Sequence, residues 1–207
     1  NLFDWTLHEQ ETMSNLTGSA MWVFRDFPTP LLPENSIPFM NQKGVVTRDG
    51  TPKESYYAFQ SYWADKPMIH IYGHTWPVRW GKPNEPREVK VFSNCREVEL
   101  FVNGVSAGVK ERNNADFPAA GLHWSVKFNE GTNTLRAVGR GDGAAVTDEI
   151  SQAYQTASWG RLTKLTLTEI TQTNGIATIE TRAFDKNNVP CLDAANMIRF
   201  GLTGDGR

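Results

Sequence analysis

The chain has 207 residues, of which 39% are hydrophobic and 21% are charged, and its formal net charge at pH 7 is −2. A charge this small argues against nucleic acid or an anionic membrane as a partner, and no apolar run approaches the ~20 residues that a membrane span needs. The length suits one or two globular domains. We therefore expect no nucleic acid among its partners and no membrane span.

The first predicted element is a helix over residues 2–16, where apolar side chains recur with an imperfect 3.6-residue period. An apolar run at residues 20–24 then predicts a buried strand that opens onto Arg25 and Asp26. A strand that delivers an aromatic residue, a cation and a carboxylate into a loop is typical of the sugar pockets of α/β barrels. The chain opens at Asn1 and holds too few such elements for a barrel of ~250 residues, so we expect it to be part of a longer protein.

A second helix is predicted after a proline-rich loop. Thr51 and Glu54 have the spacing of a capping box, and Pro52 occupies the first helical position. Aromatic side chains then recur at three- and four-residue spacing on one side of this helix: Tyr56, Phe59, Tyr62 and Trp63. Pro67 closes the segment, and we expect the helix to cover the preceding strand.

From residue 68 the sequence alternates with the two-residue period of β-strands. The strands predicted in this part of the chain cover residues 68–72, 88–92, 97–102, 105–110, 124–128 and 134–138. Asn103 and Gly104 favour a two-residue type I′ turn between two of them. Short strands at roughly even spacing, with no helix signal, predict an immunoglobulin-like β-sandwich at residues 67–157.

A second group of strands is predicted at residues 162–168, 176–184 and 197–202. This is about half of an immunoglobulin-like domain of ~100 residues, so we expect residues 158–207 to be an incomplete second sandwich that continues past Arg207. Cys95 and Cys191 fall in different predicted domains, and we expect neither a disulfide nor a metal site from them.

Two spaced motifs precede the second predicted helix: Trp22-x-Phe24-x-Asp26-Phe27 and Asn41-x-Lys43-Gly44. Together they resemble the last strand and loop of the catalytic barrel in glycoside hydrolase family 2, which includes β-galactosidases, β-glucuronidases and β-mannosidases. The run at residues 93–104 resembles the immunoglobulin-like domains that follow this barrel in many members. The resemblance implies a mostly β chain in which residues 1–66 end a (β/α)8 barrel, 67–157 form one sandwich and 158–207 form part of a second.

The resemblance also implies a retaining exo-β-glycosidase, which uses two carboxyl groups ~5–5.5 Å apart and no cofactor. In the family both catalytic glutamates precede the helix that the start of this chain resembles, so we expect no catalytic residue in the chain. Asn84-Glu85-Pro86 matches the motif of the family's acid/base, but it follows the last barrel-like strand, and a turn explains it better. His70 and His74 lie on a strand broken by Gly73, so we expect no metal site there.

Five residues are carried over from the family as candidate substrate contacts: Trp22, Arg25, Asp26, Asn41 and Lys43. Trp22 would form the floor of the terminal-sugar subsite or pack in the core. Arg25 and Asp26 would bond sugar hydroxyls or pair with each other. In β-glucuronidases the Asn-x-Lys element reaches the sugar carboxylate, and an ammonium and an amide on one loop can share an anion. Lys43 would equally serve a sulfated or neutral galactan, or cap the following helix region.

The expected partners are an oligo- or polysaccharide substrate and the remainder of the catalytic domain. A β-galactosidase is the first interpretation, because a long tail of immunoglobulin-like domains is common among such enzymes. A β-glucuronidase is the alternative, on the evidence of Asn41 and Lys43. A non-catalytic adhesion module is a third interpretation, but it has no need for the barrel-like residues 19–63. We expect the first sandwich to be a structural spacer and the protein to be periplasmic or secreted.

Overall fold

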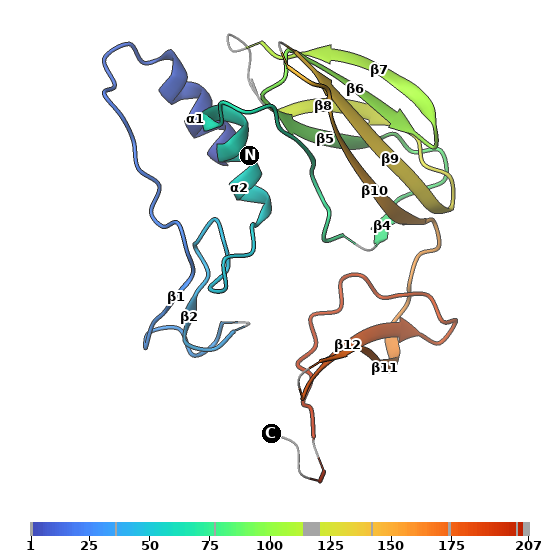
Figure 1. The fold of residues 1–207 in the computed structure, drawn as a ribbon. Coiled ribbons are helices and arrows are strands. Elements are labelled where there is room, and N and C mark those ends of the chain that lie inside the picture. The colour runs from blue at the N-terminus through green and yellow to red at the C-terminus, as the bar shows by residue number, and fades with distance from the viewer. Residues whose placement is uncertain are drawn as a thin grey trace. The chain divides into compact units, whose positions relative to one another are not determined.

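A computed structural model describes residues 2–35, 37–76, 78–113, 121–141, 143–173, 175–201 and 203–204, without the side chains of residues 169, 170 and 173. The chain forms two compact units, Asn1–Gln155 and Thr156–Arg207, and each is described by itself (Figure 1). The predicted boundary between residues 66 and 67 lies inside the first unit, and the division into three domains stays a prediction. None of the helices in the described ranges is long and apolar enough to cross a membrane.

The mostly β fold is confirmed, since strands make up most of the regular structure in the described residues. The part of the chain before the sandwich contains α1 (Leu2–Thr12), β1 (Phe27–Pro28), β2 (Met40–Asn41) and α2 (Glu54–Trp63). The two helices pack together through Phe3 and Phe59, whose ring centroids are 5.3 Å apart. Strands β1 and β2 form a small antiparallel pair.

The strand predicted at residues 20–24 is not a regular strand in the structure. Its backbone instead runs beside residues 45–46, where Val45 and Val46 donate N–H groups to the carbonyls of Val23 and Phe24. A strand exists only where a neighbour supplies its hydrogen bonds. In the described residues this neighbour is two residues long, so the pairing amounts to isolated bridges.

The predicted capping box at the start of α2 is wrong. The Thr51 hydroxyl bonds the carboxylate of Asp49, at 3.2 Å. The Glu54 carboxylate is also engaged elsewhere, because it bonds the His70 ring and accepts the backbone N–H of Gly73, both at 3.0 Å. A local bond to Asp49 occupies Thr51 and bonds to distant residues occupy Glu54, so α2 begins at Glu54 without a side-chain cap.

Two sheets form the predicted sandwich. The smaller sheet has the order β3-β5-β8, and its strands are β3 (Ile69–Ile71), β5 (Arg87–Ser93) and β8 (Gly121–Val126). The larger sheet has the order β4-β10-β9-β6-β7, and its strands are β4 (Val78–Trp80), β6 (Glu97–Val102), β7 (Val105–Glu111), β9 (Gly131–Arg140) and β10 (Val146–Gln155). The predicted turn between β6 and β7 has φ of 51° at Asn103 and 80° at Gly104, as a type I′ turn requires.

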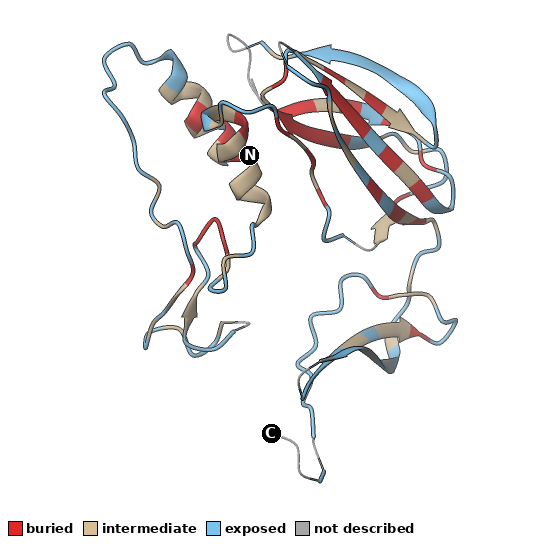
Figure 2. Ribbon diagram, in the orientation of Figure 1, coloured by how far each residue is buried: buried red, intermediate tan, exposed pale blue. Residues whose placement is uncertain are grey.

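The core lies between the two sheets, and buried and more exposed residues alternate along parts of β9 and β10 (Figure 2). Its fully buried aliphatic side chains are Ile71, Val89, Val91, Val98, Leu100, Leu135 and Ala137. Strand β7 is exposed over its whole length, as an edge strand of the larger sheet. The predicted strands do not include β10, because the polar Gln152 occupies one of its buried positions and interrupts the apolar alternation. The Gln152 side-chain amide donates a hydrogen bond to the carbonyl of Gly73, at 2.7 Å.

Helices α1 and α2 cover the outer face of the smaller sheet. Val89 and Val91 of β5 point into the core, so Lys90 between them points to the opposite face, yet it is buried. Its ammonium pairs with the buried carboxylate of Asp4 in α1 and lies 4.5 Å from the ring centroid of Phe92. A buried charge is tolerated only when it is paired, so this contact fixes α1 on the sheet.

The second unit contains one antiparallel hairpin, β11 (Leu162–Thr173) and β12 (Ile176–Asp185). The predicted strand at residues 197–202 is wrong for residues 197–201, which pair with no neighbouring strand among the described residues; Leu202 lies outside them. Asp185 accepts hydrogen bonds from the backbone N–H groups of Gly160, Asn187 and Val189 at 2.8–2.9 Å. The bonds from Gly160 and Val189, above all, hold the pKa of the Asp185 carboxyl below its ordinary value.

Candidate functional site

Asp26 anchors the loop that carries the predicted site residues. Its side chain is buried, and Oδ1 accepts hydrogen bonds from Lys53 Nζ at 2.7 Å and from the Gly44 backbone N–H at 2.9 Å. Gly44 passes so close to the chain at residues 25–26 that an added Cβ would lie 2.4 Å from the Asp26 nitrogen. Only glycine permits this approach. The site therefore has a fixed base, made from residues 25, 26, 44 and 53.

Asn41 and Lys43 stand on the loop that this base holds. Asn41 Oδ1 accepts the Lys43 backbone N–H at 3.1 Å, which closes a tight local turn. Lys53 Nζ also donates to the Gln42 carbonyl, at 3.0 Å. The Lys43 side chain is exposed, and within the described residues its ammonium has neither an ion pair nor a hydrogen bond. Two donors, an amide NH2 and an ammonium, are thus presented on one turn.

Trp22 and Arg25 lie on the segment beside this loop, and both are exposed. Trp22 is 78% exposed, so within the described residues it belongs to no core. Arg25 does not pair with Asp26, whose ionic partner is Lys53. The structure thus brings Asp26, Asn41 and Lys43 to one loop base and places Arg25 directly before it. Substrate contact by these five residues stays a prediction.

Glu85, which matches the acid/base motif, lies in a turn before β5. Its backbone N–H donates to the Lys82 carbonyl at 3.2 Å, and its carboxylate accepts the Lys82 N–H at 2.9 Å. The carboxylate is also 3.5 Å from Arg87. These bonds are those of a surface turn, which agrees with the interpretation of Glu85 as a turn residue.

The structure brings Asp148 to His70 and His74, which the sequence offered only as a pair on a broken strand. His70 is stacked between Tyr57 and His74, with ring centroids 3.5 and 4.4 Å away. His74 Nε2 lies 2.7 Å from Asp148 Oδ2, on strand β10. No local pattern links Asp148 to the histidines, because 74 residues separate it from His74. Only the packing of the two sheets, which brings the turn after β3 close to β10, could have revealed this cluster.

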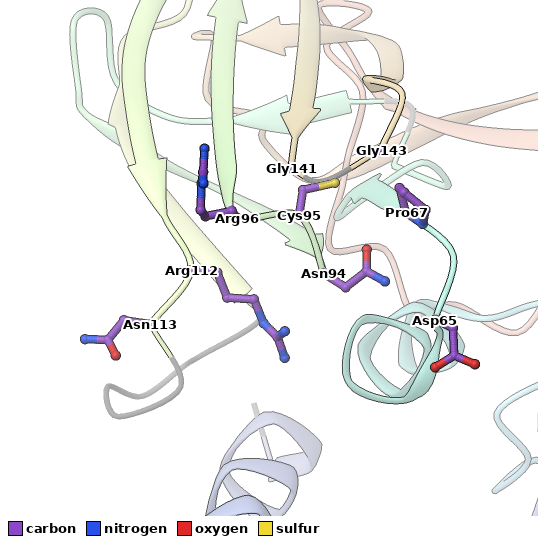
Figure 3. A pocket seen from close by; sticks show the side chains of 9 residues that line it. All are labelled: Asp65, Pro67, Asn94, Cys95, Arg96, Arg112, Asn113, Gly141 and Gly143. Atoms are coloured by element: carbon purple, nitrogen blue, oxygen red, sulfur yellow. The ribbon is translucent and has the colours of Figure 1, made fainter.

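A pocket lies elsewhere in the first unit, at the turn between β5 and β6 (Figure 3). Its volume is about 740 Å³, and it is lined by Asp65, Pro67, Asn94, Cys95, Arg96, Arg112, Asn113, Gly141 and Gly143. The two arginines point in different directions in Figure 3, and the Asn94 amide is already bonded to the carbonyls of Ala64 and Lys66. The pocket contains none of the five predicted site residues.

Comparison with known proteins identifies relatives across nearly the whole chain. The apo structure of Bacteroides uniformis β-glucuronidase 3 is 60% identical, with a TM-score of 0.88 over 93% of this chain and 25% of its own. The crystal structure of Parabacteroides merdae β-glucuronidase is 55% identical, with a TM-score of 0.87 over 92% of this chain and 24% of its own. The Bacteroides ovatus protein named β-galactosidase BoGH2A is 32% identical over 92% of this chain and 22% of its own length.

A family model described as a domain of unknown function, DUF4982, matches residues 84–147, which include most of the sandwich. The chain spans about a quarter of the length of the relatives it matches. These relatives are glycosidases, and more of them carry the name β-glucuronidase than β-galactosidase. The expectation of a glycosidase is supported, whereas the preference for a β-galactosidase is not; the alternative fits better.

Proposed function

We propose that this chain, which belongs to glycoside hydrolase family 2, is part of a retaining exo-β-glucuronidase that acts on oligo- or polysaccharides. The observation that carries the proposal is the turn on which Asn41 and the exposed Lys43 stand together. A glucuronide differs from a neutral hexoside by a carboxylate, and an ammonium beside an amide is a donor set suited to that anion. The names of the relatives support the same substrate.

Asp26 and Lys53 are the proposed positioning residues for this turn. The Asp26 carboxylate is buried and already bonded to Lys53 and Gly44, so its part is to hold the loop rather than to contact sugar. A lysine that binds a carboxylate needs such support. Donors that move freely must be ordered when the anion binds, and this loss of conformational entropy weakens binding.

Trp22 is the proposed floor of the terminal-sugar subsite. Its exposure leaves an aromatic face open, and such faces stack on the apolar faces of sugar rings. Arg25, three residues further along the same segment, is exposed and is proposed to bond sugar hydroxyls or to assist Lys43 at the carboxylate. The two catalytic carboxyl groups are proposed to lie on another part of the protein.

A β-galactosidase is the second candidate, and the similarity to the B. ovatus enzyme favours it. The carboxylate of the sugar distinguishes a glucuronide from a galactoside, and so distinguishes the two candidate functions. Without it, Lys43 would face a hydroxyl and would be worth less to binding, because a charge-assisted hydrogen bond is stronger than a neutral one.

The sandwich is proposed to be a structural spacer that is fixed to the catalytic domain rather than a mobile module. Its support is the set of polar contacts that join the helices to the smaller sheet, namely Asp4 with Lys90 and Glu54 with His70 and Gly73. We propose the same three segments as before: residues 1–66 end the barrel, 67–157 form the sandwich, and 158–207 are part of a second sandwich. The remainder of the catalytic domain is the proposed partner of residues 1–66.

The proposal is tested with the intact protein on p-nitrophenyl β-D-glucuronide and β-D-galactoside. We expect turnover of the glucuronide, and we expect Lys43→Ala to lower its kcat/KM by about 100-fold, since a substrate carboxylate left without its charged partner costs about 3 kcal/mol. Lys127→Ala, which removes an exposed lysine of the sandwich, is the matched control and leaves the rate unchanged. Turnover of the galactoside alone, or equal rates for Lys43→Ala and the parent, would overturn the proposal.

A further inference from the structure

Four side chains that can ligate a metal ion meet where α2 reaches the sandwich. Glu54 comes from the first turn of α2, His70 from β3, His74 from the turn after β3, and Asp148 from β10. One donor atom from each of His70, His74 and Asp148 lies within 4.8 Å of the other two. Glu54 lies outside this group of three, but its Oε2 is 3.0 Å from His70 Nε2 and is the nearest candidate for a fourth donor.

Backbone groups hold both carboxylates of this cluster in place. Asp148 Oδ2 accepts the Ile71 N–H at 2.7 Å, and Glu54 Oε1 accepts the Gly73 N–H at 3.0 Å. His70 is buried, and Tyr57 lies parallel to its ring at a centroid distance of 3.5 Å. Hydrogen bonds and packing that orient the ligands in this way are the usual support of a metal site.

The donor chemistry selects the class of ion. Two imidazoles and two carboxylates form the nitrogen and oxygen set that Zn²⁺ accepts in tetrahedral geometry. Ca²⁺ and Mg²⁺ prefer oxygen donors alone, and neither would gain from the histidines. We propose that Glu54, His70, His74 and Asp148 bind Zn²⁺, and that the ion ties α2 to strands β3 and β10.

Binding requires one local movement. The rings of His70 and His74 are nearly parallel, at 13°, and metal–nitrogen bonds lie in the ring plane, so one ion cannot meet both rings in this stack. His74 has room to turn, because its side chain is 37% exposed and it follows Gly73, whose φ is +105°. The hydrogen bonds between His70 and Glu54 and between His74 and Asp148 are the contacts that the ion would replace.

The test is a ZnCl2 titration of the intact protein after dialysis against a chelator, followed by calorimetry and thermal unfolding. We expect one tight Zn²⁺ site in this part of the protein and a rise in Tm of about 5 °C at a hundredfold excess over the Kd. His74→Ala and Asp148→Asn are expected to weaken binding at this site at least 100-fold. His123→Ala, which removes a half-exposed histidine of β8 paired with Glu88, is expected to bind Zn²⁺ as the parent does.

Each other outcome overturns the proposal. An absence of binding heat and of any Tm shift would mean that the cluster is a hydrogen-bonded contact and nothing more. Binding that survives both His74→Ala and Asp148→Asn would place the ion elsewhere. Circular dichroism of the two variants without metal is the control for their folding. An equal rise in Tm with CaCl2 would contradict the choice of Zn²⁺. Because calorimetry and Tm need no turnover, the result is independent of the substrate proposal.

Discussion

The ion pair between Asp26 and Lys53 is expected to stabilise the loop base by an amount that a double-mutant cycle can measure. Only 4% of the Asp26 side chain is exposed, whereas 28% of the Lys53 side chain is, and the two charged atoms are 2.7 Å apart. A hydrogen bond to a charged group is worth about 1.5–3 kcal/mol. Water around Lys53 screens the pair, so we place the coupling at the lower end, about 1.5 kcal/mol.

The cycle uses Asp26→Asn, Lys53→Met and the double variant. Asparagine keeps an oxygen that can accept the Gly44 N–H, so the first change removes the charge and little else. The free energy of unfolding is measured in urea by tryptophan fluorescence for all four proteins. Glu34→Gln, which changes an exposed carboxylate of the same segment, is the control and is expected to have no effect.

The same cycle has a kinetic readout. Because Lys53 also holds the Gln42 carbonyl, loss of the pair should displace the turn that carries Lys43, and kcat/KM for the glucuronide should fall with the stability. Single changes whose unfolding free energies add to within about 0.5 kcal/mol would show that the two residues are independent. That result would refute the argument that they form the base of the site.

Three further outcomes are expected. Gly44→Ala should destabilise the loop and lower activity, because its Cβ would meet the Asp26 backbone at 2.4 Å, whereas Gly18→Ala, with nothing within 4 Å, should be neutral in the same assays. Trp22→Ala should lower kcat/KM by roughly 30- to 1000-fold through loss of a stacking surface worth about 2–4 kcal/mol; an unchanged value would remove Trp22 from the subsite. The pKa of Asp185 is lowered by backbone N–H bonds, so its contribution to stability is complete above the unfolded value of about 3.9 and is lost as the pH falls through the folded value; unfolding of Asp185→Asn, followed against pH, should lack this acid-sensitive step.

The sequence by itself determined the features that depend on neighbours along the chain. The two-residue period of residues 97–102 predicted a strand, and β6 covers the same residues. Asn103 and Gly104 predicted the hairpin turn, because few other residues adopt positive φ without strain. The order of the Trp22 and Lys43 motifs predicted the family, which the relatives bear out.

Tertiary structure decided the features in which a side chain chooses among several partners. Asp26 had the adjacent Arg25 as one possible partner, yet it bonds Lys53, 27 residues away. Glu54 had the spacing of a capping box, yet its carboxylate bonds His70 and Gly73. The spacing of residues along the chain shows which polar contacts are possible. The free energy of each contact depends on burial and on competing donors, and these are set only when distant segments pack together.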